Sequence, residues 1–465
     1  MKNTRFRSII IYIVICFFFA GIGFFLFEFI TSSRQWAFSP VNRHLSEGSM
    51  SGGKILDTNN IILAQTLDGK RIYNEKEDVR KAMLHTVGDG SVLIPTSVQS
   101  RYNSELFGYN PVTGFGAPHV FDINQNIKLT LDSEICAKVF KSFKDRKGAA
   151  LAYNYLTGEV LCMVSLPTYD VNNRPAFEEI SRDKYEGMYI NRAISSSFTP
   201  GSIFKIFTTA AALDLIPGVE NRTFECKKVK IIDGEKVTCM SSHGKINLKD
   251  AMSKSCDIVF SDIAIELGRE KMKSKMEEYG LNMPEYFDGM QVVSSSYDVT
   301  NASKADLGWS GIGQSKDKVS PLYMLKVMGA IANKGIHVEP FAVKSVFTDS
   351  SVEYSNNSKN LSKRMFSETT AESLKEMMRY TMKNQYKDLM FGGIQMCAKT
   401  GTAEVGGDKL PHGWMVGFSY DKTFPVAFSV VVENGDFGIR SAGPIAAEMI
   451  KDLHGAFKSG KYEKK

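Results

Sequence analysis

Residues 8–27 form a predominantly apolar run that contains no charged side chain. A helix rises about 1.5 Å per residue, so this run is long enough to cross a hydrocarbon layer of roughly 30 Å. Lys2, Arg5 and Arg7 precede the run, and positive charges before a span favour a cytoplasmic N-terminus. Because no small-x-small cleavage site separates the run from Trp36, the pattern predicts a membrane anchor in place of a cleaved signal peptide.

After the anchor, short strand-like runs alternate with clusters of Gly, Asn and Asp. Residues 54–56 and 61–64 are such runs, and the breaker-rich stretch 110–118 indicates a domain boundary. This first part of the chain reads as a small accessory region. The expected division is residues 1–7 as a cytoplasmic N-terminus, 8–27 as the transmembrane anchor, 28–118 as the extracytoplasmic accessory region and 119–465 as the main domain.

The main domain has strand patterns near both of its ends and helical patterns between them. The expected elements are a strand at 127–131, a helix at 134–143, a hairpin of 149–155 with 159–165, strands at 414–420 and 426–432, and a helix at 442–457. We expect a sheet to begin with the first of these strands, and both ends of the domain to share it. Early and late strands around a helical block predict an α+β fold.

The bulk composition is that of a folded protein with more than one part. Among 465 residues, 43% are apolar and 23% are charged, which is enough apolar material to bury a core. The formal net charge of +6 is spread without long basic runs. This distribution argues against a nucleic-acid-binding protein and favours an ordinary solvated surface.

Ser202 and Lys205 form a Ser-x-x-Lys motif directly after a Pro-Gly pair. The run 203–215 lacks Gly and Pro and is apolar on nearly every face, as in a buried helix. Residues three apart lie on one helical face, so the hydroxyl of Ser202 and the amine of Lys205 can converge. Similar strings at 51–54 and 181–184 lack this setting.

Two further motifs follow in order, Ser255-Cys256-Asp257 and Lys399-Thr400-Gly401-Thr402. A serine hydroxyl needs a base to attack a carbonyl, and Lys205 is the candidate. A lysine with the usual pKa of about 10.4 is almost wholly protonated near pH 7, so the site must lower that pKa by about three units. Desolvation and the like charge of Lys399 would supply the shift. The motifs together predict serine acyl transfer with no cofactor and no metal.

The motif order and the surrounding sequence resemble the penicillin-recognising serine transferases, specifically the transpeptidase domain of class B (monofunctional) penicillin-binding proteins. The resemblance runs from about residue 127 to residue 455 and includes the segments 191–193, 243–244, 311–314 and 413–417. It implies a central antiparallel sheet flanked by helices, together with a helical subdomain.

The resemblance also assigns roles at the site. In similar proteins the backbone N–H groups of the nucleophile and of the residue after Lys-Thr-Gly form the oxyanion hole, and these are Ser202 and Thr402 here. The hydroxyls of Thr400 and Thr402 are expected to bind the terminal carboxylate of a peptide substrate, which Lys399 would attract. Gly401 fits a strand that the substrate backbone must approach closely.

Asp257 stands where the family usually has the Asn of a Ser-x-Asn motif. An ionised Asp257 beside Lys205 would raise the lysine pKa and oppose the required shift. It can avoid this by pairing with Lys399 or by being protonated through burial. Otherwise Ser255 relays protons while Lys205 stays charged. We expect the pairing with Lys399, and the alternative is a structural role as N-cap of a helix through residues 258–267.

Cys16 lies in the predicted span, and the other six cysteines show no metal-type spacing. Cys226 and Cys239 flank a predicted hairpin with an Asp-Gly turn at 233–234. This turn sets Cys239 opposite Lys228 and leaves Cys226 on a diagonal, about 7 to 8 Å away. That separation is beyond easy disulfide reach, so we expect no bridge unless the turn has another length.

Three further residues lie beside the motif segments. His243 and His412 invite a Ser-His hypothesis, but Lys205 already occupies the base position, so packing or hydrogen-bonding roles are expected. Trp414 is expected in the core or in the wall of a cleft. The segment 311–314 is expected to be a structural turn near the site.

The leading hypothesis is a membrane-anchored peptidoglycan D,D-transpeptidase. Ser202 would attack a D-Ala-D-Ala stem peptide, release D-Ala and pass the acyl group to an amine of a neighbouring stem, and β-lactams would acylate the same serine. About 90 residues between the anchor and the main domain are too few for a glycosyltransferase domain. A glycan-polymerising membrane partner is therefore expected.

Two other functions are compatible with parts of the sequence. A β-lactamase or β-lactam sensor shares the first and third motifs, and residues 278–282 match the Glu-x-x-Leu-Asn of class A deacylation loops. However, Gly280 in that segment is typical of a helix C-terminus, which favours an accidental match. The other alternative is an inactive scaffold for wall synthesis, against which three chemically competent motifs argue.

Overall fold

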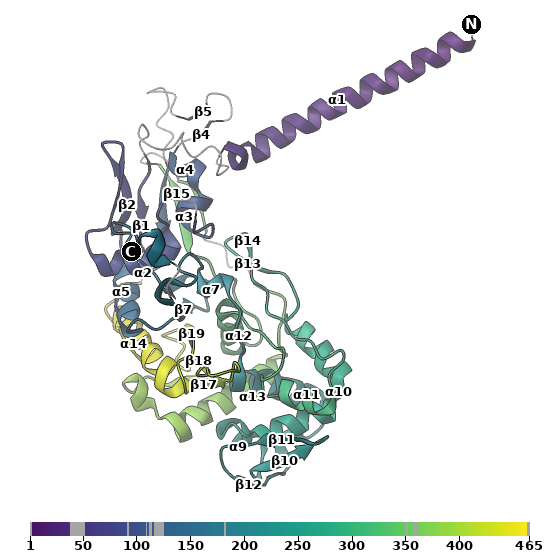
Figure 1. Ribbon diagram of the computed structural model, residues 1–465, viewed down its shortest axis with the longest axis vertical. Coiled ribbons are helices and arrows are strands. Elements are labelled where there is room, and N and C mark those ends of the chain that lie inside the picture. The colour runs from purple at the N-terminus through teal and green to yellow at the C-terminus, as the bar shows by residue number, and fades with distance from the viewer. Residues whose placement is uncertain are drawn as a thin grey trace.

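The computed structural model describes residues 2–37, 52–90, 93–107, 109–110, 114–115, 125–180, 183–348, 352–356 and 361–462. Helix α1, Lys2–Ala37, stands apart from the folded body in Figure 1. Its segment Ser8–Glu28 is long and apolar enough to cross a membrane, and none of it is buried against the protein. The span predicted at residues 8–27 therefore lies within one continuous helix.

A five-stranded antiparallel sheet with the order β17-β18-β19-β7-β8 forms the centre of the main domain. Its strands are β7 (Gly148–Asn154), β8 (Val160–Leu166), β17 (Met396–Ala403), β18 (His412–Ser419) and β19 (Val426–Val432). Strands from the two ends of the domain thus share one sheet, as the sequence predicted. Every residue of β8 and β19 is buried, because helices cover the sheet.

Helices α12 and α14 cover opposite faces of this sheet. On α12, Gly329 leaves room for the Tyr153 hydroxyl, which a Cβ would approach to 1.5 Å. A Cβ at Gly413 of β18 would point to the other face of the sheet, where the missing side chain leaves room for Ser441 of α14. Helix α14 also packs against α5. The bounds are Ser133–Ser142 for α5, Pro321–Ala332 for α12 and Gly438–Lys458 for α14. The predicted helices at 134–143 and 442–457 are therefore present.

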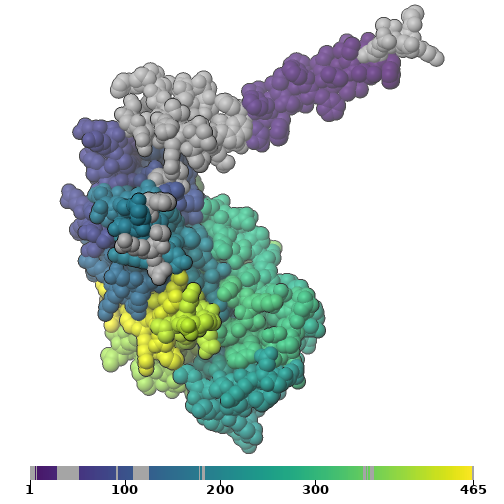
Figure 2. Space-filling model, viewed as in Figure 1, coloured from purple at the N-terminus to yellow at the C-terminus, as the bar shows by residue number. Residues whose placement is uncertain are grey.

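A block of helices lies between the early and late strands of the sheet. It contains α8 (Lys205–Leu215), α9 (Leu248–Ser253), α10 (Asp257–Glu278), α11 (Lys304–Ser310) and α13 (Glu368–Thr381). In Figure 2 teal and green residues of this block lie beside the yellow C-terminal residues. Residues 205–212 of α8 are all buried, which explains why this run is apolar on nearly every face.

A second sheet, of six strands in the order β16-β15-β6-β1-β2-β3, joins the accessory region to the main domain. The expectation that the strand at 127–131 begins the central sheet is wrong. That strand, β6, pairs in parallel with β1 and antiparallel with β15, and its residues Ile127 and Leu129 are fully buried there. Most of the predicted boundary stretch 110–118 lies outside the described residues.

The accessory region contains short strands and helices. Its strands are β1 (Ile55–Leu56), β2 (Ile62–Leu67), β3 (Lys70–Tyr73), β4 (Tyr109–Asn110) and β5 (Gly114–Phe115), and its helices are α2 (Glu77–Val87), α3 (Val98–Arg101) and α4 (Asn103–Phe107). The main domain supplies the other three strands of the six-stranded sheet, which are β6 (Asn126–Leu129), β15 (Val343–Phe347) and β16 (Val352–Ser355). Further short elements of the main domain are α6 (Phe177–Ile180), α7 (Arg192–Ser195), β13 (Glu285–Phe287) and β14 (Met290–Val292).

Residues 224–246 form a hairpin lobe beside α10. Strand β9 (Phe224–Cys226) pairs with β12 (Gly244–Ile246), and β10 (Val229–Ile232) pairs with β11 (Glu235–Thr238). The predicted two-residue turn is present, and the N–H of Cys239 donates to the carbonyl of Lys228 at 2.8 Å. The predicted register is therefore confirmed. Cys226 and Cys239 are both free thiols, so no bridge joins them.

Candidate active site

Ser202 lies in a 3-10 turn, Gly201–Phe204, that leads directly into α8. Gly201 has a φ of 55°, in the left-handed region that glycine adopts without strain. A Cβ on Gly201 would lie 2.4 Å from the carbonyl oxygen of Thr402. The turn therefore packs directly on strand β17, and a glycine before the nucleophile allows the first and third motifs to meet.

Lys205 begins α8, and its Nζ contacts three side chains of the site. It lies 2.9 Å from Ser202 Oγ and 3.0 Å from Ser255 Oγ. Its shortest contact is with Asp257, whose Oδ1 accepts at 2.6 Å. The convergence of Ser202 and Lys205, which the three-residue spacing predicted, is present.

The expected pairing of Asp257 with Lys399 is wrong, because the carboxylate forms its salt bridge with Lys205. The Lys205 side chain is completely buried, whereas the side chain of Asp257 is 21% exposed. A buried ammonium group requires a partner of opposite charge, and Asp257 supplies it. Asp257 is also not an N-cap, since it is the first residue of α10 and Cys256 occupies the N-cap position.

Lys399 extends from β17 to the other side of Ser255. Its Nζ lies 3.0 Å from Ser255 Oγ and donates to the carbonyl of Thr400 at 2.9 Å. Burial, and after it the charge of Lys205, lowers the pKa of Lys399 well below its usual value, and the charge of Asp257 opposes this only in part. The ammonium group of Lys399 therefore loses its proton more readily than that of an exposed lysine.

Ser255 connects the two lysines. Its Oγ contacts both amines, and its carbonyl oxygen accepts from Lys205 at 2.9 Å. Ser255 has a φ of 53°, which is uncommon for a residue other than glycine. This conformation presents both its hydroxyl and its carbonyl oxygen to Lys205. The two serines and two lysines consequently form one continuous path of polar contacts.

Thr400 and Thr402 lie on β17, which is an edge strand of the central sheet. The N–H of Thr400 donates to the Tyr386 hydroxyl at 3.4 Å, on the side away from β18. Backbone groups two residues apart on a strand point the same way, so the N–H of Thr402 also points away from β18. This orientation is the one that an oxyanion donor at Thr402 requires.

The packing around Gly401 gives a different reason for glycine from the one expected. A Cβ at Gly401 would lie 2.8 Å from the carbonyl oxygen of Pro200 and 3.1 Å from the side chains of Ile203 and Trp414. These neighbours belong to the nucleophile turn and to β18. The missing side chain therefore allows β17 to pack against the turn that carries Ser202.

The segment 311–314 is a structural turn beside the site, as expected. The carbonyl of Gly313 accepts from the N–H of Gly201 at 2.9 Å. Gln314 Nε2 donates to the carbonyl of Thr402 at 3.1 Å. The turn thus joins the residue before the nucleophile to the third motif, a role that the sequence analysis did not assign to Gln314.

Trp414 and His412 have packing roles, as expected. Trp414 is fully buried, and its Nε1 donates to the carbonyl of Thr199 at 2.9 Å. Nδ1 of His412 accepts from the N–H of Asn434 at 3.1 Å, and the ring packs edge-on against Phe198.

A cleft of about 1020 Å³ opens over Ser202, Ser255 and Asp257. Its walls come from the hairpin lobe, α11, β17 and the start of α14. Tyr386 is a wall residue that the sequence analysis missed, and its hydroxyl lies 2.7 Å from Thr400 Oγ1. Isolated aromatic residues between motifs carry no spacing signal that could have identified them. The other lining residues include Trp309, Ile312, Gln314, Thr400, Thr402, Phe437 and Ile439.

Three curated relatives illustrate what this chain is similar to. The peptidoglycan D,D-transpeptidases PbpA of Mycolicibacterium smegmatis and of Mycobacterium tuberculosis are each 30% identical, over 324 and 323 residues that make up 65% of this chain and 65% of theirs. Penicillin-binding protein 3 of Bacillus subtilis is 25% identical over 375 residues, 74% of this chain and 54% of its own length. The chain thus spans just under two thirds of the length of the PbpA proteins.

Solved structures of PbpA from Mycobacterium tuberculosis have the same fold. Its crystal structure has a TM-score of 0.73 at 26% identity and covers 87% of this chain and 100% of that one. Its ceftriaxone acyl-enzyme complex has a TM-score of 0.76 at 25% identity, covering 88% of this chain and 99% of that one. The family model described as "Penicillin binding protein transpeptidase domain" matches residues 148–451, which include all three motifs. This chain therefore belongs to the penicillin-binding protein transpeptidase family.

Proposed function

We propose that this protein is a membrane-anchored peptidoglycan D,D-transpeptidase with Ser202 as its nucleophile. The observation that carries the proposal is the contact of 2.9 Å between Ser202 Oγ and Lys205 Nζ at the base of the cleft. A nucleophile within hydrogen-bond reach of a base, with a third group that orients the base, is the arrangement of covalent acyl transfer. Asp257 is the orienting group here.

The path of polar contacts supports a proton relay that activates Ser202. Lys399, whose pKa burial lowers well below its usual value, would accept the proton at the end of the path as a neutral amine. As Ser202 gives its proton to Lys205, Lys205 gives one of its own to Ser255, and the Ser255 proton moves to Lys399. Lys205 then stays paired with Asp257 throughout, and the positive charge that the relay creates on Lys399 is balanced by the negative charge that develops on Ser202 Oγ.

The activated Ser202 Oγ then attacks the carbonyl carbon of a D-Ala-D-Ala stem peptide. The backbone N–H groups of Ser202 and Thr402 would stabilise the oxyanion. The C–N bond breaks, the leaving D-Ala amine takes the proton back from the relay, and an acyl-enzyme forms. Because a neutral Lys399 attracts a carboxylate weakly, carboxylate binding is assigned to the hydroxyls of Thr400 and Thr402.

The second half of the reaction reverses the relay. An amine of a neighbouring stem attacks the ester, gives its proton to the relay, and Ser202 leaves with a proton returned from it. A β-lactam presents an amide in a strained ring, so its opening leaves the acyl group on Ser202. The acyl-enzyme complex of PbpA from Mycobacterium tuberculosis with ceftriaxone supports this part of the proposal.

We extend the proposal to topology and partners. The basic residues before α1 support a cytoplasmic N-terminus, residues 8–27 as the anchor, and a catalytic domain outside the membrane. Residues 28–118 and 119–465 would then be the accessory region and the transpeptidase domain. The glycan strands would come from a separate glycan-polymerising membrane enzyme.

The hydrolase and sensor alternatives receive no support from the Glu278 segment. Glu278 pairs with Lys275 and lines a different cavity from Ser202. Rapid hydrolysis of an acyl-enzyme requires a water-activating group beside the ester, and Glu278 does not occupy that position.

Full-length protein in detergent, exposed to a penicillin and digested, provides the test. Peptide mass mapping should place a long-lived adduct on Ser202, and Ser202→Ala should abolish it. Ser181→Ala, in the rival Ser-x-x-Lys string, is the matched control and should label normally. Fast turnover of nitrocefin would identify a hydrolase, and normal wall growth with Ser202→Ala would identify a scaffold.

A further inference from the structure

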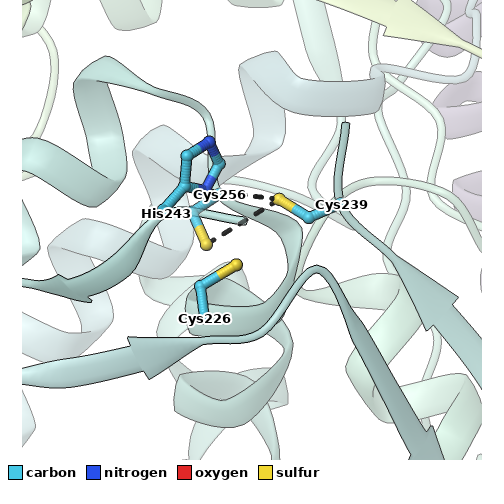
Figure 3. A group of neighbouring side chains, drawn as sticks. All are labelled: Cys226, Cys239, His243 and Cys256. Atoms are coloured by element: carbon cyan, nitrogen blue, oxygen red, sulfur yellow. Dashed lines mark hydrogen bonds between the residues drawn. The ribbon is translucent and has the colours of Figure 1, made fainter. Parts of the chain in front are cut away.

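Four side chains from separate parts of the chain meet at the base of the hairpin lobe: Cys226, Cys239, His243 and Cys256 (Figure 3). Their sulfur and ring-nitrogen atoms all lie within 4.8 Å of one another. The three cysteines are buried and His243 is partly exposed. Figure 3 shows the side chains directed toward a common centre.

Two of the separations between these atoms match those of a tetrahedral metal site. Cys239 Sγ lies 3.8 Å from Cys256 Sγ and 3.6 Å from His243 Nδ1. For Zn–S bonds of about 2.3 Å and a Zn–N bond of about 2.05 Å, a regular tetrahedron places two sulfurs about 3.8 Å apart and a sulfur and a nitrogen about 3.6 Å apart. The two separations from Cys239 therefore equal those that zinc would impose, and every other pair of donor atoms lies within 4.8 Å.

A disulfide accounts for less of this arrangement. A disulfide bond has a length of about 2.05 Å, and it would join only two of the three thiols. It would leave a third buried thiol and an imidazole nitrogen directed at the same point. Elsewhere in the described residues, Cys136 and Cys162 approach to 3.7 Å, and that pair has no third or fourth ligand around it. Three sulfurs and one imidazole form a Cys₃His donor set, which is typical of structural zinc.

Groups around the four residues would orient them for a metal. His243 Nε2 lies 3.1 Å from Ser241 Oγ, so a proton on Nε2 leaves Nδ1 free to bind. The backbone N–H of Asp257 donates to Cys239 Sγ at 3.3 Å, a bond that stabilises a thiolate. Zinc ligands are commonly held by such outer hydrogen bonds.

The hairpin lobe has a structural need for a cross-link. Its two sheets have only two strands each, and most residues of β10 and β11 are exposed. An isolated two-stranded sheet is marginally stable in water. Three ligands come from the lobe, and the fourth, Cys256, is the N-cap of α10. A metal at this point would therefore fasten the lobe to the helix that begins with Asp257.

We propose that Cys226, Cys239, His243 and Cys256 bind one structural zinc ion, which holds the second active-site motif in place. On binding, the three thiols lose their protons to solvent and the imidazole remains neutral. Cys256 lies between Ser255, which joins the two lysines, and Asp257, which pairs with Lys205. Cys239 and its neighbours in the lobe also line the cleft. The ion acts as a positioning element and takes no part in the chemistry.

The zinc content of the full-length protein, purified in detergent without added metal, tests the site itself. Elemental mass spectrometry of the acid-digested protein should find about one zinc ion per chain. Cys226→Ser should lose most of it, whereas His243→Cys, which replaces one zinc ligand by another, should retain it. Cys162→Ser is the matched control, a buried cysteine outside the cluster, and should also retain the ion.

Two measurements on the unaltered chain remain informative even if a variant fails to fold. A strong chelator should lower the unfolding temperature, and zinc but not magnesium should restore it. Cobalt added in place of zinc should give the intense visible bands of tetrahedral thiolate coordination. Zinc removal should slow labelling of Ser202 by penicillin at least tenfold, and its return should restore the rate.

Several results would overturn the proposal. A wild-type chain with no zinc and no cobalt bands would do so, as would a Cys239–Cys256 disulfide found by peptide mapping without reduction. Zinc loss in Cys162→Ser equal to that in Cys226→Ser would show that the ion is bound elsewhere or nonspecifically. Normal penicillin labelling after complete zinc removal would refute the positioning role. The zinc content, the cobalt bands and the unfolding temperatures do not depend on the transpeptidase proposal, whereas the labelling rate rests on it.

Discussion

Asp257 Oδ1 lies 2.6 Å from Lys205 Nζ, so the buried ammonium of the first motif is paired with a carboxylate of the second. Asn at this position keeps an oxygen acceptor for Lys205 but removes the negative charge. We expect Asp257→Asn to retain penicillin acylation within about tenfold, because the hydrogen bond persists. Asp257→Ala should lose more of the acylation rate, since it leaves a buried cation without a partner.

The second-order rate constant for labelling by a fluorescent penicillin measures the effect of both substitutions. A loss beyond about a hundredfold in the Asn variant would show that the charge itself is essential.

The lowered pKa of Lys399 predicts the pH dependence of acylation. The relay needs the neutral amine, and its fraction rises as the pH rises through the pKa of Lys399. The acylation rate should therefore increase with pH and then level off, with its midpoint below the usual lysine pKa. Lys399→Arg should remove at least about a hundredfold of the rate at every pH, because a guanidinium does not deprotonate.

Measuring the labelling rate from about pH 5 to about pH 9 tests this prediction. Lys334→Arg, at an exposed lysine that pairs with Glu368, is the control and should follow the wild-type profile. A rate that falls with rising pH over this range would contradict a neutral Lys399 as the proton acceptor.

Close packing of β17 on the nucleophile turn predicts the effect of a methyl group at Gly401. In Gly401→Ala the Cβ would lie 2.8 Å from the carbonyl of Pro200, so either the strand or the turn must move. We expect a stability loss of about 1 to 3 kcal/mol and a drop in acylation of at least about tenfold. Gly455→Ala is the control, because nothing lies near that Cβ on helix α14 and Ala favours a helix. Chemical denaturation and penicillin labelling should both leave this control close to wild type.

The buried imidazole of His85, far from the active site, should make the folded state less stable in acid. Burial is the main cause that lowers its pKa from 6.5 to about 4, although the hydrogen bond to the Met188 carbonyl acts in the opposite direction. Because the unfolded chain binds this proton more readily, the contribution of neutral His85 is complete above about pH 6.5 and is lost as the pH falls toward about 4. The loss is on the order of 3 kcal/mol.

Unfolding curves between about pH 7 and about pH 4 test the His85 prediction. His85→Gln cannot take up the proton and should show a weaker pH dependence, even if its stability at neutral pH is lower. His454→Gln, at a partly exposed histidine of α14, should keep most of the wild-type dependence. Equal slopes in wild type and His85→Gln would assign the acid sensitivity to other groups.

Local sequence patterns predicted the elements of the central sheet well. The strand-rich runs and turn signals of β7 and β8 and of β18 and β19 lie close together in the chain, so short-range rules suffice. The same holds for α8, whose apolar run and Ser-x-x-Lys spacing predicted a buried helix with a converging serine and lysine.

Contacts between distant segments could not be predicted in the same way. Strand β6 was assigned to the wrong sheet, because its parallel partner β1 and antiparallel partner β15 are remote in sequence. The choice of Lys205 over Lys399 as partner of Asp257 depends on how β17 and the start of α10 approach each other. The cysteine and histidine cluster escaped notice for a different reason, since its members all lie within residues 226–256 but show no recurrent spacing.

The six-stranded sheet has a practical consequence for anyone who truncates this protein. Strand β6 lies between β1, from the N-terminal part, and β15, from the middle of the catalytic sequence. A fragment that starts at residue 119 would lack β1, so one edge of β6 would be unpaired and exposed to solvent. Exposed strand edges promote aggregation. Soluble expression should begin upstream of Ile55, so that the catalytic half keeps the three short strands that complete it.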